Sequence, residues 1–177
     1  MSLPNSHVRC HGCDFHAVIE RRPLTLRYVL PNGETVDGGR LSAWCGTCAG
    51  IRDVEAPLDA DALGRQLYAL SKSSRSPWQR IAKLMTRDGD AGRAASQAEQ
   101  QRISGLLRLA EVRTSPPRCL TCGSTAVTFI RFSDPETSST FVHSCGGRLY
   151  RVPPDPDWPR ISYRPEVIRL DANGLRL

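Results

Sequence analysis

The chain has 177 residues with 6% aromatic side chains, which suits one ordinary domain or two or three small ones and excludes a single large aromatic core. Its first ten residues lack a signal-peptide-like apolar run, and no eighteen consecutive residues are apolar, so we expect a cytoplasmic protein with no membrane segment. The formal charge of +6 would fall to about +3 if seven thiolates held two zinc ions, so charge alone is weak evidence for a nucleic-acid partner.

Residues 1–57 have the pattern of short strands. Apolar and polar residues alternate over residues 24–30, and a Pro-Asn-Gly turn follows at 31–33, which predicts a hairpin that returns through residues 34–36. A further short strand is predicted at residues 41–44, just before a cysteine.

Residues 58–114 change to helical spacing. Leucines recur on one helical face over residues 63–70, behind two aspartates that favour a helix N-terminus. A Ser-Pro start at residues 76–77 predicts a second helix, and the capping box at residues 96–99 predicts a third. Residues 88–95 are rich in glycine and aspartate, and we expect a flexible loop there.

Strand signals return after residue 114. Strands are predicted at residues 127–132 and 141–150, and a proline-rich connection leads to a terminal hairpin around the turn at 171–174. The predicted fold class is therefore α+β, with two small β-hairpin modules joined by a helical middle segment. The expected segments are residues 1–57, 58–114, 115–152 and 153–177.

Two C-x2-C motifs dominate the first segment. Cys10 and Cys13 form one pair, Cys45 and Cys48 form the other, and 31 residues separate the pairs. Two such turns brought together by a hairpin supply the four thiolates of a tetrahedral zinc site. A redox dithiol at Trp44-Cys-Gly-Thr-Cys is the alternative, but such a dithiol opens a helix, whereas the following residues suit a turn and a strand. Unligated core cysteines are a further alternative.

The second set contains three cysteines, so its fourth ligand must be another residue type. Cys119, Cys122 and Cys145 are the thiols, and His143 is the natural fourth ligand, with Asp134 or water as alternatives. Three histidines surround the first pair of cysteines, and we expect them to be solvated or to lie around an already complete shell: His7, His11 and His16.

Both halves resemble zinc ribbons, which are small β-hairpin modules with two metal-binding knuckles. The resemblance covers roughly residues 8–56 and 117–152 and is carried by the C-x2-C pairs, by C-x2-C-G at Cys122 and by the later C-G-G at Cys145. It implies two structural zinc ions. Zinc ribbons occur in transcription, replication, ribosomal and defence proteins and as protein-docking modules, so the resemblance implies either kind of role.

The chain has no sequence motif of an active site. It contains no G-x-S-x-G, H-E-x-x-H, Walker or deaminase pattern, and a closed shell of four ligands leaves no coordination position for water. We therefore expect a protein that is not an enzyme and has no small-molecule substrate.

Two functional hypotheses follow, and the sequence leaves both open. The first is a module that binds the nucleic-acid backbone with low specificity, because residues 58–113 hold ten basic against six acidic side chains. The second is an adaptor that docks on a larger protein complex, through its proline-rich segment or the edge of its terminal hairpin. Under the first hypothesis the candidate phosphate contacts are Lys72, Arg75, Arg80, Lys83 and Arg87.

Overall fold

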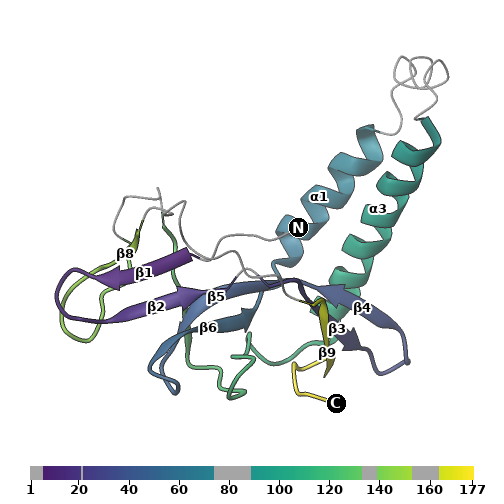
Figure 1. Ribbon diagram of the computed structural model, residues 1–177. Coiled ribbons are helices and arrows are strands. Elements are labelled where there is room, and N and C mark those ends of the chain that lie inside the picture. The colour runs from purple at the N-terminus through teal and green to yellow at the C-terminus, as the bar shows by residue number, and fades with distance from the viewer. Residues whose placement is uncertain (1–5, 21, 74–88, 133–138, 153–163) are drawn as a thin grey trace. The chain divides into compact units, whose positions relative to one another are not determined.

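The computed structural model describes residues 6–20, 22–73, 89–132, 139–152 and 164–177 (Figure 1). The chain divides into two compact units, and each unit is assembled from three separate segments. The sequence instead predicts four consecutive segments. Unit 1 consists of Met1–Leu26, Gly39–Ala56 and Pro116–Ile168, and unit 2 consists of Arg27–Gly38, Pro57–Ser115 and Arg169–Leu177.

Unit 1 contains two antiparallel three-stranded sheets. One has the order β2-β1-β8, with β1 at Ser6–Cys10, β2 at His16–Ile19 and β8 at Leu149–Val152. The other has the order β6-β5-β7, with β5 at Arg40–Cys45, β6 at Gly50–Glu55 and β7 at Val127–Phe129. In both sheets the central strand comes from the N-terminal part of the chain and ends in a cysteine, and one neighbour comes from the C-terminal part (Figure 1).

An apolar cluster lies beneath the first of these sheets. Val8, Cys10, Ile51 and Leu149 are buried in it, and aromatic side chains including Trp44 pack around them. Complete burial of a side chain such as Val8 or Leu149 contributes about 1.5–3 kcal/mol to folding. The alternation along β1 explains the pattern, because successive strand residues point to opposite faces and only every second one reaches the cluster.

Unit 2 combines two helices with a strand hairpin. Helix α1 covers Ala60–Ser73 and α3 covers Gly89–Val112, and the two pack side by side (Figure 1). A sheet of order β4-β3-β9 contains β3 (Leu24–Val29), β4 (Thr35–Gly38) and β9 (Glu166–Asp171), of which β3 and β9 cross the unit boundaries. Val36 of β4 packs on Gly105 of α3. A Cβ added to Gly105 would lie 3.2 Å from each of the two γ-carbons of Val36. None of the helices in the described residues is long and apolar enough to cross a membrane.

The α+β class agrees with the sequence, and the hairpin predicted at residues 24–36 is found as β3 and β4, with Gly33 in the turn at a φ of 82°. The loop expected at residues 88–95 is wrong, because α3 begins at Gly89. Three alanines among these residues favour helix, and Glu99 of the supposed capping box pairs with Arg102 at 2.7 and 2.8 Å. The second predicted helix, from residue 77, lies outside the described residues.

The C-terminal elements are shorter than predicted. The strand expected at 127–132 ends at Phe129, and residues 141–150 contain a single bridge between Val142 and Arg148 before β8 begins. The terminal hairpin is present as β9 followed by a turn, in which Gly174 has a φ of 78°.

Asn173, in that turn, holds the chain that leaves α3. Its side-chain oxygen accepts hydrogen bonds from the backbone N–H of Thr114 (3.0 Å), the Thr114 hydroxyl (3.1 Å) and the backbone N–H of Ser115 (3.3 Å). The Ser115 hydroxyl donates in return to the Asn173 carbonyl at 2.7 Å. One amide oxygen therefore fixes the terminal turn to the end of the helix.

Replacing Asn173 by Ala removes the shared acceptor, and we expect the free energy of unfolding to fall by about 1 kcal/mol, since water can replace part of these bonds. Urea denaturation followed by circular dichroism measures the change. Asn173→Asp keeps an acceptor oxygen at the same place and should lose less. Equal losses in the two variants would contradict the role assigned to the oxygen.

Candidate metal centres

The eight predicted ligands form two groups in the structure. Within each group the ligand atoms all lie within 4.8 Å of one another, so each group could hold a metal ion. The outer site, built from the first and last motifs of the chain, consists of Cys10, Cys13, His143 and Cys145. The inner site, built from the two middle motifs, consists of Cys45, Cys48, Cys119 and Cys122.

The pairing of motifs predicted from the sequence is wrong. Cys10 and Cys13 were expected to share one site with Cys45 and Cys48, but the two pairs lie in different groups. The physical reason is strand pairing, because β1 pairs with β8 and β5 pairs with β7, so each central strand takes one of its two neighbours from beyond residue 120. The motifs are therefore nested, first with fourth and second with third.

Strand pairing and two glycines build the outer site. Cys10 is the last residue of β1 and lies opposite Leu149, which opens β8 shortly after Cys145. The turns that follow pack backbone to backbone, since a Cβ on Gly147 would lie 2.5 Å from the Gly12 nitrogen and 2.7 Å from the Cys10 sulfur. Only glycine fits at this contact.

The distances in the outer site suit a tetrahedral ion. Zn–S bonds of about 2.3 Å and a Zn–N bond of about 2.0 Å place sulfurs about 3.8 Å apart and sulfur about 3.5 Å from nitrogen. The Cys10 and Cys145 sulfurs are 3.4 Å apart, and the Nδ1 atom of His143 lies 3.5 Å from the Cys13 sulfur and 3.2 Å from that of Cys145. The Nδ1 atom is thus the one presented to an ion. Asp134, the alternative fourth ligand, lies outside the described residues.

The inner site depends on a short segment held against β6. The Glu55 N–H donates to the Arg118 carbonyl at 3.1 Å, and the Arg118 N–H donates to the buried Glu55 carboxylate at 2.7 Å. The Leu120 N–H donates to the Asp53 carbonyl at 2.9 Å. These bonds fix Cys119 between them, opposite Val54 of β6, whose neighbouring strand β5 ends in Cys45.

The inner site also has tetrahedral spacing. The Cys45 sulfur is 3.5 Å from that of Cys122, and the Cys48 sulfur is 4.0 Å from that of Cys119. Both distances lie close to the 3.8 Å or so expected around zinc and far above the roughly 2.05 Å of a disulfide. All seven cysteines are accordingly free thiols.

The residue after the last cysteine of three of the four motifs adopts the left-handed backbone conformation. Gly123 and Gly146 have φ values of 72° and 84°, and Ala49 has a φ of 47°. This conformation turns the chain sharply back toward the metal site, and glycine adopts it without steric cost. Ala49 adopts it at a cost of about 1–2 kcal/mol.

Trp44, the tryptophan that precedes Cys-Gly-Thr-Cys, packs against other ring side chains. Its ring centroid lies 5.2 Å from the ring of His143, 5.4 Å from Phe15 and 5.2 Å from Phe141. The residue next to an inner ligand therefore packs on an outer ligand. After Cys48 the chain turns into strand β6 rather than into a helix, which is the context expected for a metal-binding turn and not for a redox dithiol.

The thiols differ in acidity. The imidazole of His143 and the Gly147 N–H lower the pKa of Cys145 to about 6, and the Ser124 N–H together with Cys48 lowers the pKa of Cys122 to about 7. The hydrogen bond to Cys122 raises the pKa of Cys48 to about 12. Negative charge near neutral pH is thus concentrated on the exposed thiols Cys122 and Cys145, which are well placed to attract a cation.

No family model matches this chain, and no curated protein or solved structure matches it either.

The three N-terminal histidines belong to neither ligand group. The Nδ1 atom of His7 lies 3.1 Å from the Nε2 atom of His16, and His11 stacks on Tyr150 with ring centroids 4.2 Å apart. Of the predicted phosphate contacts, Lys72 is exposed in the last turn of α1, with its ammonium 4.8 Å from the centre of the Tyr68 ring. Arg75, Arg80, Lys83 and Arg87 lie outside the described residues.

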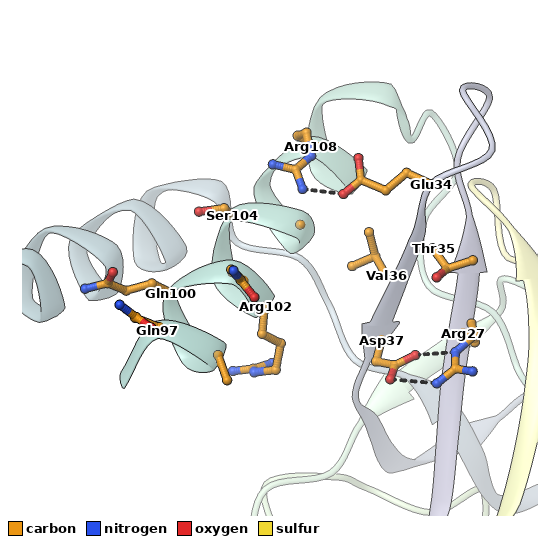
Figure 2. Close-up of a pocket in the computed structure, with 13 residues that line it drawn as sticks. Arg27, Glu34, Thr35, Val36, Asp37, Gln97, Gln100, Arg102, Ser104 and Arg108 are labelled. Carbon is orange, nitrogen blue, oxygen red and sulfur yellow. Dashed lines mark hydrogen bonds and ion pairs between the residues drawn. The ribbon is translucent and has the colours of Figure 1, made fainter. Parts of the chain in front are cut away.

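Unit 2 contains a polar groove of about 900 Å³ between α3 and the β3–β4 hairpin, which the sequence analysis did not find (Figure 2). Arg27 pairs with Asp37 at 2.7 and 3.0 Å, and Arg108 pairs with Glu34. These guanidinium groups are already neutralised by carboxylates, so the groove offers little attraction to an anion. No local sequence signal marks it, because it is formed by elements far apart in the chain.

Paired substitutions distinguish nested from sequential pairing. The variant with both Cys10→Ser and Cys145→Ser alters two ligands of the outer site only, so purified protein should keep one zinc per chain by elemental analysis. The variant with both Cys10→Ser and Cys45→Ser alters one ligand in each site and should lose both ions or bind both weakly. The reverse result, with one zinc kept in the second variant, would restore the sequential pairing.

Gly147→Ala should empty the outer site and leave the inner site filled, because the new methyl group collides with the Gly12 backbone and the Cys10 sulfur. Zinc content should fall from two to one per chain. Gly64→Ala in α1 is the matched control, since a Cβ there has no neighbour within 4 Å. Full zinc content in Gly147→Ala would contradict the close contact of the two turns.

Proposed function

We propose that the protein is a non-catalytic module that holds two structural zinc ions and binds nucleic acid through its phosphate backbone. The observation that carries the metal part is the presence of two complete sets of four ligands at tetrahedral spacing. Bound zinc would cross-link distant strands in unit 1. With four protein ligands around each ion no position remains for water or substrate, which supports a structural role rather than catalysis.

The nucleic-acid part is supported by charge. The chain has an excess of six basic side chains, and residues 58–113 supply four of that excess. Lys72 is exposed at the end of α1, and the chain that follows contains four more of the predicted phosphate contacts before α3 begins. Cationic side chains gathered in one segment attract phosphates and release their counterions.

Salt dependence tests this function. Binding of a generic oligonucleotide, followed by fluorescence anisotropy, should weaken linearly on a log–log plot against salt. Combining Arg80→Ala, Lys83→Ala and Arg87→Ala should reduce the slope by up to about three, one for each lost phosphate contact. The control combines Arg27→Ala with Arg102→Ala, because both arginines are already paired with carboxylates, and it should leave the slope unchanged.

A second candidate function, an adaptor that docks on a larger protein complex, is favoured by the terminal hairpin. Leu175 and Leu177 are 51% and 68% exposed, and apolar side chains grouped in this way are common at protein interfaces. Under this alternative the oligonucleotide would bind weakly and the triple variant would show the wild-type salt slope. That result, obtained with folded protein, would favour the adaptor.

A further inference from the structure

The sheet β2-β1-β8 in unit 1 has one buried face and one exposed face of a different character. Val8, Cys10 and Leu149 point into the apolar cluster. By strand alternation the neighbouring residues point to the other side. This outer face carries His7 and Arg9 from β1, His16 and Val18 from β2, and Tyr150 from β8.

The register places Arg9 in the middle of this face. Its Cα partners are His16 on one neighbouring strand and Tyr150 on the other. The three side chains therefore form a row across the sheet, with strand spacings of about 4.8 Å. A guanidinium group is thus flanked on both sides by flat rings.

The rings on this face are already held in place. His11 lies nearly parallel to Tyr150, with an interplanar angle of 20° and a centroid distance of 4.2 Å. His7 and His16 are joined by a 3.1 Å contact between ring nitrogens. His11 is exposed, so part of its side chain is accessible to a further flat group. Fixed rings lose little conformational freedom when they bind a ligand.

The charge of the face favours an anionic ligand. Arg9 is exposed and takes part in none of the ion pairs found among the described residues. No acidic residue belongs to the three strands on this side; the nearest along the chain, Asp14 and Glu20, flank β2 at its two ends. An unpaired guanidinium among aromatic rings matches a ligand that carries phosphates and flat bases.

We propose that this outer face binds single-stranded nucleic acid, with bases stacked on the His11–Tyr150 pair and a phosphate held by Arg9. The inference rests on the proposed nucleic-acid function and names the surface and the kind of strand. Unpaired bases expose their π-faces to His, Tyr and Arg side chains, as on other open sheets that bind single strands, whereas a duplex hides those faces. The three strands also present no helix that would enter the major groove of a duplex.

The test uses the full chain loaded with two zinc ions. Its probes are oligothymidylate and oligouridylate of about 15 nucleotides, and a duplex of equal length. We expect both single strands to bind more tightly than the duplex at equal salt. Tyr150→Ala and His11→Ala should each weaken single-strand binding at least about fivefold, the lower end of what one lost base stack costs. Tyr150→Phe keeps the ring and should bind as the unaltered protein does.

Arg9→Ala should weaken binding and lower the salt slope by about one, while Arg9→Lys should restore the slope. Val112→Ala is the control, because Val112 is a 42% exposed side chain at the end of α3 in unit 2, and it should change nothing. The zinc content of every variant must remain two per chain. Exposed His11 lies outside the apolar cluster, so His11→Ala provides a folded variant if Tyr150→Ala loses zinc.

The outcomes separate the two proposals. If the unaltered protein binds none of the probes, both the nucleic-acid function and this surface are wrong. If it binds them and the zinc-loaded variants of Arg9, His11 and Tyr150 bind equally well, only the surface is wrong. A duplex bound as tightly as the single strands would overturn the stacking.

Discussion

The structure of unit 1 depends on bringing together two sets of four candidate metal ligands that lie far apart in the chain. The inner site joins Cys48 to Cys119 across 70 residues, whereas the sequential alternative would join Cys13 to Cys45 across 31. This extra loop length costs only about 0.7 kcal/mol, because closure entropy grows with the logarithm of length. Once the inner site is closed, only residues 14–44 and 123–142 separate the outer motifs. Nesting therefore adds little entropy cost, and sheet pairing can select it.

The two sites are linked by packing as well as by the chain. Trp44 belongs to β5, whose last residue is the inner ligand Cys45, and its ring lies against the outer ligand His143. Phe15, two residues after Cys13, contacts both Trp44 and His143. Displacing the ligands of either site would therefore disturb the same aromatic side chains, Trp44 and Phe15. The sites are therefore joined by shared aromatic contacts within unit 1, although each has its own four ligands.

What the sequence predicted well was local. A C-x2-C turn and a glycine after it are features of a few adjacent residues, so the ligands and the hairpin around Gly33 could be recognised from them. The sequence could not predict which motifs share a site, because nothing in a cysteine motif specifies its partner motif. Strand pairings such as Cys10 with Leu149 decide this, and they join residues far apart in the chain. The start of α3 was missed for a local reason. The helix propensity of the alanines outweighed that of the glycines and aspartates, which suggested a loop. The groove in unit 2 and the outer face of the sheet around β1 could not be predicted either, because each is formed by elements far apart in the chain.

Strand β1 ties the metal core to the proposed binding face. Cys10 points inward as a ligand while Arg9 points outward, and a slip of one residue in the pairing with β8 would exchange the two faces. The outer site forbids such a slip, since Cys10 must meet Cys145 and the turns touch at Gly12 and Gly147. Ligand closure thus fixes which side chains the sheet exposes. For this reason the arrangement of Arg9 between flat rings depends on the same strand register that brings the outer ligands together.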